Sequence, residues 1–129
     1  MKRVVIESPL GSRVDGTRAS AEEFARNQRY VLRAMRHSLE RGEAPFASHA
    51  LYPLVLNDAT PEERKQGMQA GFEWGRMADT CVVYADHGVT QGMKAGIERA
   101  RMHNVPVEHR YIGEEPIEEG PVRFKVDGV

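Results

Sequence analysis

The 129-residue sequence contains one cysteine, one tryptophan and no long hydrophobic run, and its formal net charge is only -1. A lone cysteine excludes a disulfide framework, and Cys81 stands within the apolar run "CVVYA", as a small core residue does. No apolar stretch approaches the roughly 18 residues of a membrane span, and the N-terminus lacks the hydrophobic segment of a signal peptide. The near-neutral charge gives no electrostatic reason to expect binding to nucleic acid or to a membrane. We therefore expect a cytoplasmic protein.

The hydrophobic pattern predicts short strands that alternate with helices. The run "RVVIESP" predicts a buried strand at Arg3–Glu7, ended by proline. The run "TCVVYAD" predicts a strand that is covered on both faces, because it is apolar throughout. We expect two further strands, one near Pro45–Ser48 and one in "VPVEHRYI".

Three helices have recognisable starts or ends. Ser20 is a suitable N-cap for the first helix, and Gly42 suits the position after its last turn. Thr60 followed by Pro61 predicts the start of the second helix. The third helix is expected at about Thr90–Met102.

This alternation predicts the α/β class, with parallel strands joined by right-handed connections. We expect a three-layer α/β/α sandwich, flavodoxin-like or Rossmann-like, with a mainly parallel sheet of four to five strands. The α/β domain should span residues 1–113. Residues 114–129 form an acidic, proline-broken extension, in which "VRFKV" predicts a short edge strand.

Polar residues and glycines follow the predicted strands, and in such sheets ligands bind at the carboxyl ends of the strands. Glycines beside a helix N-terminus allow close approach of the backbone to a phosphate or carboxylate, and Arg13 is suited to clamp an anionic group. The candidate ligand-binding residues are Glu7, Ser8, Pro9, Gly11, Ser12, Arg13, His49, Tyr52, Gly88, Gly92, Met93 and Lys94.

Each of these features also has a structural interpretation. The glycine-rich turn is compatible with a simple tight turn, and His49 with a cap at a strand end. Asp86 is suited to cap the loop that follows it, and Tyr52 to pack in the interior. The five histidines are scattered without ligand spacing, so we expect neither a metal nor another cofactor.

Four segments, "VVIESP", "GEAPFASHALY", "DATPEERKQGMQAG" and "MADTCVVYADHGVTQGMKAGIERA", resemble a family of small bacterial and phage proteins of unassigned function. That family resembles a branch of the nucleoside 2-deoxyribosyltransferase superfamily, which also contains the nucleoside 5′-monophosphate N-glycosidases. The resemblance covers about Val4 to Ile112. It implies a flavodoxin-like sheet, a nucleoside or nucleotide ligand, and a homodimer or larger assembly whose subunits complete each other's sites.

The resemblance also implies a catalytic arrangement. In the enzymes a carboxylate on the helix after the third strand attacks the anomeric carbon, and a second acid helps the base to depart. Asp86 aligns with an acid of the family site, but Lys94 occupies the position of the nucleophile. An ammonium cannot attack as a carboxylate does, so Glu98, Glu73 or Glu7 would have to replace it.

Two functions of different classes follow. The first is an N-glycosidase or deoxyribosyltransferase that acts on the base–sugar bond of a (deoxy)nucleoside 5′-monophosphate, with Asp86 and a relocated carboxylate as catalytic residues. The second is a non-catalytic protein that senses or sequesters a nucleotide, with Lys94 as a phosphate contact. A third interpretation is an assembly protein whose pocket is vestigial.

Overall fold

The fold is that of a computed structural model, which describes residues 1–113 of the chain. Its centre is a four-stranded parallel sheet in the order β2-β1-β3-β4. This order is that of flavodoxin-like folds, in which the strand order switches between β1 and β3. The strands are β1 (Arg3–Glu7), β2 (Ala44–Phe46), β3 (Thr80–Tyr84) and β4 (Val107–Arg110). The predicted fold class is therefore confirmed, whereas the edge strand expected in "VRFKV" lies outside the described residues.

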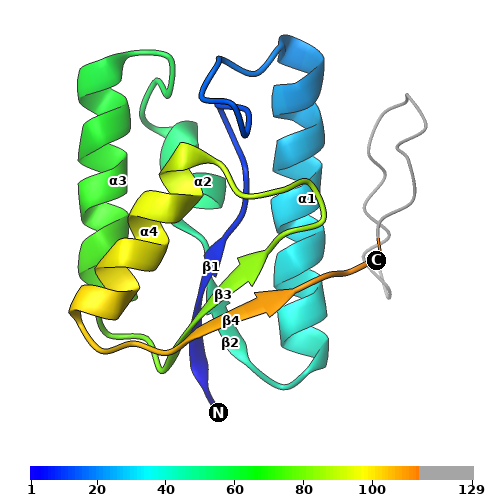
Figure 1. Ribbon diagram of the computed structural model, residues 1–129, viewed down its shortest axis with the longest axis vertical. Helices are drawn as coiled ribbons and strands as arrows, with labels where there is room; N and C mark the ends of the chain where they lie inside the picture. The colour runs from blue at the N-terminus through cyan, green and yellow to red at the C-terminus, as the bar shows by residue number, and fades with distance from the viewer. Residues whose placement is uncertain (114–129) are drawn as a thin grey trace.

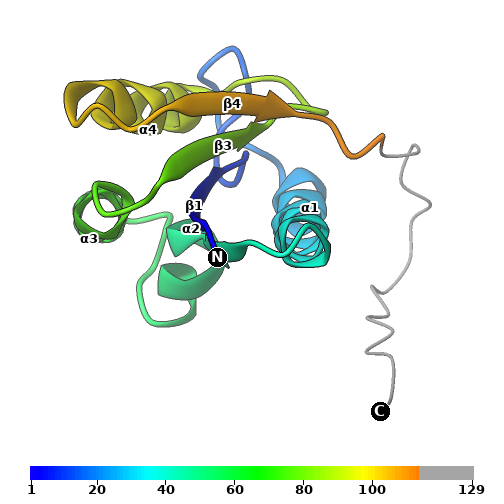
Figure 2. The same ribbon diagram turned by 90° about the horizontal axis from the view of Figure 1, so that it is seen from below.

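Helices cover both faces of this sheet. Helix α1 packs on one face, and α3 and α4 lie on the other (Figures 1 and 2). Among residues 1–113, no helix is both long and apolar enough to cross a membrane. The helical elements are α1 (Ala21–Glu40), the short α2 (Ser48–Leu51) with the 3-10 turn η1 (Tyr52–Leu54), α3 (Pro61–Gly75) and α4 (Gln91–Met102).

The helix starts agree closely with the sequence signals. Ser20 forms a capping box with Glu23, in which each side chain accepts a hydrogen bond from the other residue's backbone N–H. Thr90 caps α4 by accepting from the backbone N–H of Met93. The strand expected near Pro45–Ser48 ends earlier, at Phe46, because Ser48 already begins α2.

The central strand β3 divides its side chains between two cores. Val82 and Tyr84 face α1, whereas Cys81 and Val83 pack with residues of α4 on the opposite face. This division follows from the alternation of side chains along a strand. Burial raises the pKa of the Cys81 thiol to about 12, so the thiol stays protonated in the core.

A buried ion pair joins the sheet to the end of α1. Arg110 donates two hydrogen bonds to the Glu43 carboxylate, at 2.7 and 2.6 Å, and a third to the hydroxyl of Tyr84 at 3.2 Å. The Arg110 and Glu43 side chains are only 7% and 11% exposed. These hydrogen bonds from Arg110 hold the pKa of Glu43 down at about 2.

Replacing Glu43 with glutamine should therefore destabilise the fold by about 2 kcal/mol at pH 7, because Arg110 would keep only the half-exposed carboxylate of Glu108 as a counter-charge. The lowered pKa of Glu43 means that its contribution is present above about pH 4.5 and is lost as the pH falls towards 2. Urea unfolding of wild type and Glu43→Gln across this range measures the effect. The control is Glu40→Gln, which removes an exposed ion pair with Arg36 and should cost well under 1 kcal/mol. Equal losses in the two variants would contradict a stabilising buried pair.

Candidate functional site

A cleft lies beside β1 and its carboxyl end, at the switch in strand order. It is bounded by the loop after β1, by α2, and by the facing sides of α3 and α4, which lie together on this face of the sheet (Figure 1). The cleft has a free volume of about 90 Å³ and opens to solvent at its mouth. Its polar lining consists of Glu7, Ser8, Ser12, Ser48, His49, Asp58, Arg64, Arg76, Thr90, Arg99 and His103.

Glu7, the last residue of β1, reaches across the cleft to α4. A β-carbon on Gly96 would overlap the Glu7 carboxyl group, so glycine at this point of the helix leaves room for that group in its observed position. No hydrogen bond or ion pair joins the Glu7 carboxyl group to another residue within 1–113. With no cation to offset it, desolvation raises the pKa of Glu7 to about 8. At neutral pH this group is therefore mostly a protonated acid.

Ser8 and His49 form the second polar feature of the cleft. The Ser8 Oγ lies 2.5 Å from Nε2 of His49, and the serine is almost completely buried. Desolvation lowers the pKa of His49 to about 4, so the imidazole is neutral at physiological pH. A neutral imidazole in a cleft is able to accept a proton.

The mouth of the cleft is formed by two loops and two arginines. The Asp58 carboxylate packs directly on the backbone of Gly11, where a β-carbon would overlap it. Arg64 donates a hydrogen bond of 3.3 Å to the hydroxyl of Ser12. Arg99 places its guanidinium carbon 5.1 Å from the centre of the Phe72 ring. Cationic and aromatic surface therefore surrounds the entrance.

The structure brings together seven of the ligand-binding residues expected from the sequence: Glu7, Ser8, Gly11, Ser12, His49, Gly92 and Met93. Five others do not line the cleft. Tyr52 packs near Phe46, with ring centres 6.5 Å apart, and Gly88 has the positive φ of 86° that its turn requires. Pro9, in the loop after β1, is buried.

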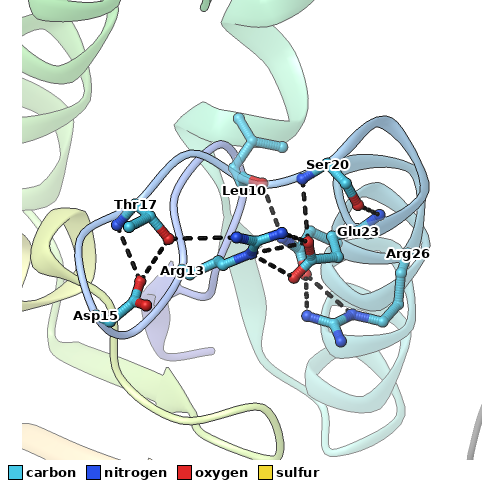
Figure 3. Close-up of polar contacts among 8 residues, drawn as sticks. Leu10, Arg13, Asp15, Thr17, Ser20, Glu23 and Arg26 are labelled. Atoms are coloured by element: carbon cyan, nitrogen blue, oxygen red, sulfur yellow. Dashed lines mark hydrogen bonds and ion pairs between the residues drawn. The ribbon is translucent and has the colours of Figure 1, made fainter.

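Arg13 is held by the carboxylate of Glu23, near the start of α1. It forms an ion pair of 2.6 Å with Glu23 and donates three hydrogen bonds to that carboxylate in all (Figure 3). Asp15 in turn accepts hydrogen bonds from the backbone and hydroxyl of Thr17. These contacts order the loop after β1 and leave Arg13 turned away from the cleft lining.

Asp86 also lies outside the cleft lining. The hydroxyl of Tyr30 donates a 2.5 Å hydrogen bond to its Oδ1. The backbone N–H groups of Ile112 and Gly113 donate to its two oxygens, each at 2.9 Å. Asp86 thus fastens the chain after β4 to α1, rather than capping only the loop that follows it.

Helix α4 turns Lys94 and Glu98 away from the cleft, whereas its Arg99 lies at the entrance. Gly92, Met93 and Gly96 line the cleft, whereas Lys94 and Glu98 are exposed and do not. Glu73 on α3 is 75% exposed and pairs with Arg76 at 3.6 Å. The ammonium of Lys94 is therefore not a charge within the cleft, and Glu7 is the one of the three proposed replacement carboxylates that lies there.

Sequence reasoning missed Asp58, Arg64 and Arg99. A signal for Arg64 existed, since Arg64, Met68 and Gly71 recur at helical spacing on the face of α3 that lines the cleft. Asp58 and Arg99 carried no such signal, because a loop and a neighbouring helix bring them to the entrance. Within residues 1–113, no group of three His, Cys, Asp or Glu side chains is arranged to hold a metal ion.

The raised pKa of Glu7 implies a pH-dependent cost to folding. The folded protein binds this proton more tightly than the unfolded chain, so stability falls as the pH rises from about 4.5 to about 8. Glu7→Gln should abolish this loss and be more stable than wild type above pH 8, as measured by urea unfolding. Glu98→Gln, on the exposed side of α4, is the matched control and should keep the wild-type pH dependence. A Glu7→Gln curve parallel to that of wild type would exclude a desolvated acid.

Comparison with known proteins places this architecture in context. No curated protein matches the chain in sequence. Among solved structures, the fold is similar to that of a 2-deoxyribosyltransferase from Bacillus psychrosaccharolyticus, described as a biocatalyst for the synthesis of antiviral and antitumoral nucleosides. The match has a TM-score of 0.57 and 15% sequence identity, and covers 90% of this chain and 77% of the other. This likeness shows a shared fold. A family model described as a domain of unknown function (DUF7768) matches residues 2–110, and the chain belongs to that family.

Proposed function

We propose that the protein cleaves the bond between the base and the sugar of a (deoxy)nucleoside 5′-monophosphate, as an N-glycosidase or deoxyribosyltransferase. The observation that carries this proposal is the Glu7 carboxyl group, which lies in the cleft with a raised pKa and without a partner among the described residues. A carboxyl group of this kind is suited to proton transfer at neutral pH. The fold shared with a 2-deoxyribosyltransferase supports the same reaction class.

In this proposal protonated Glu7 is the general acid. As the glycosidic C–N bond breaks, its electron pair goes to the base, and the Glu7 proton neutralises the charge that develops there. The sugar passes through an oxocarbenium-like state, which a neutral acid destabilises less than an arginine or lysine would. Desolvation of Glu7 thus serves the reaction by keeping the acid protonated.

His49 is the base of the proposed reaction. Its neutral imidazole accepts a proton from the water that attacks the anomeric carbon, and the hydrogen bond with Ser8 holds the ring in place. In the transferase reaction, a second base takes the place of this water. The products are the free base and the sugar phosphate, or a nucleotide with an exchanged base.

We also infer the family branch, the cellular location and the oligomeric state from the sequence resemblance. The chain would belong to the bacterial and phage branch related to the nucleoside 5′-monophosphate N-glycosidases, act in the cytoplasm and assemble as a homodimer or larger oligomer. Sedimentation equilibrium tests the assembly, and a monomer at micromolar concentration would contradict it.

A non-catalytic role in nucleotide binding is the second candidate. It is favoured by Asp86, the residue that aligns with an acid of the enzymes, because its oxygens accept structural hydrogen bonds outside the cleft. A sensor or a sequestering protein would need the cleft but no acid. The two candidates differ in whether free base is released.

The enzyme proposal predicts that Glu7→Gln lowers the rate of base release at least 100-fold while leaving nucleotide affinity within severalfold, because glutamine cannot donate the proton. Base release from a panel of nucleoside 5′-monophosphates and deoxynucleosides is measured by chromatography. Glu98→Gln is the control and should keep the wild-type rate. Wild-type protein that binds a nucleotide but releases no base would instead establish the binding role.

The pH profile tests the assignment of acid and base. The rate should fall above pH 8, as Glu7 loses its proton, and below about pH 4, as His49 gains one. The upper limb should disappear from the residual activity of Glu7→Gln. A rate that rises through pH 8 would mean that ionised Glu7 attacks the sugar as a nucleophile, and would contradict the acid role.

A further inference from the structure

An open groove continues outwards from the cleft. It runs between the loop after β1 and helix α3, and its walls share Gly11, Ser12, Asp58, Arg64 and Arg99 with the mouth of the cleft. A ligand with its reactive part beside Glu7 would therefore leave the cleft past Arg64 and enter the groove. The groove makes the site longer than a nucleoside requires.

The walls of the groove are strongly cationic. Four cationic side chains line it, Arg18, Arg64, Lys65 and Arg99, against the single carboxylate of Asp58. None of the four forms an ion pair with a carboxylate in the part of the chain that the structure describes. Other arginines of the protein, such as Arg13 and Arg110, are paired with acids. The lining of the groove thus carries an excess of positive charge, which the carboxylate of Asp58 offsets only in part.

The backbone of the loop after β1 holds part of this charge in place. Ser12 and Arg18 form an antiparallel bridge, and the N–H of Arg13 donates to the carbonyl of Thr17 at 2.7 Å. The ion pair between Arg13 of this loop and Glu23 of α1 also ties the loop to that helix (Figure 3). Ser12 therefore places its hydroxyl at Arg64 while its backbone positions Arg18 along the groove.

We propose that this groove binds the diphosphate of a nucleotide, with the first phosphate at Arg64 and Ser12 and the second towards Arg18 and Lys65. The ligand is then a nucleoside diphosphate or a larger diphosphate-linked nucleotide. A monophosphate would engage only the cations at the mouth, whereas a second phosphate brings charge to Arg18 and Lys65 as well. This inference rests on the proposed function for the location of the sugar, and replaces the monophosphate of that proposal with a diphosphate as the preferred phosphate group.

Calorimetric titration with orthophosphate and pyrophosphate tests the groove independently of the base. Pyrophosphate should bind at least tenfold more tightly, because it engages additional charge-assisted hydrogen bonds, and the difference should shrink in high salt. Adenosine, AMP and ADP form the corresponding nucleotide series, in which ADP should bind at least tenfold more tightly than AMP. Equal affinity for the two inorganic anions, or no measurable binding of either, would overturn the proposal.

Variants assign the two phosphate positions. Lys65→Ala should remove most of the additional affinity for pyrophosphate and leave orthophosphate binding within about twofold. Arg64→Ala should weaken both anions about tenfold or more. Lys94→Ala, on the exposed side of α4, is the control and should change neither affinity. Equal weakening of both anions by Lys65→Ala would overturn the assignment of a second position.

Two further measurements distinguish diphosphate binding from nucleic-acid binding and from the N-glycosidase proposal. A short single-stranded oligonucleotide that binds as tightly as pyrophosphate would assign the groove to nucleic acid and overturn the proposal. Release of free base is measured on the same protein samples. Preference for pyrophosphate without base release would support the diphosphate groove and contradict the N-glycosidase proposal. Base release without that preference would support the N-glycosidase and contradict the diphosphate groove.

Discussion

The close approach of β1 to α4, with the Glu7 carboxyl group against Gly96, is the constraint on which the candidate site depends. A side chain at position 96 would occupy the space of the carboxyl group and displace it, so the observed position of Glu7 depends on the bare backbone of Gly96. The approach withdraws the carboxyl group from water while leaving it on the wall of the cleft. The same contact therefore shapes the cleft and sets the proton affinity of its acid.

Two glutamates on this fold illustrate how surroundings decide chemistry. Glu43 faces Arg110, which lowers the pKa of the carboxyl group to about 2 and makes it a permanent charge that holds β4 to the end of α1. Glu7 has no such cation, and desolvation moves its pKa in the opposite direction, to about 8. The first residue stabilises the fold at neutral pH, and the second costs stability as it ionises. A costly acid retained in a cleft is the arrangement expected of a functional group.

The two faces of the sheet also differ in the use of their polar groups. On the α1 side, Asp86 accepts hydrogen bonds from Tyr30 and from backbone N–H groups after β4, and Arg110 donates to Glu43 and Tyr84. These contacts fasten strand ends to α1 and the residues that follow it. On the side of α3 and α4, Glu7 and the arginines of the entrance have no acid–base partners among the described residues. Asp86 aligned with a catalytic acid in sequence, and in the fold it lies on the first side, outside the cleft lining, where its oxygens accept these hydrogen bonds.

Local signals in the sequence were enough to predict the class of fold and the approximate positions of its elements. Apolar runs marked β1 and β3, and Ser20, Pro61 and Thr90 marked the starts of helices. The sequence also indicated that Glu7, Ser8 and His49 would meet, since the carboxyl ends of parallel strands share one edge. The tertiary structure alone decided which face of α4 lines the cleft, and so excluded Lys94 from it. Only packing brought Asp58, Arg64 and Arg99 to one entrance, because they come from a loop and two helices whose contact no local pattern encodes.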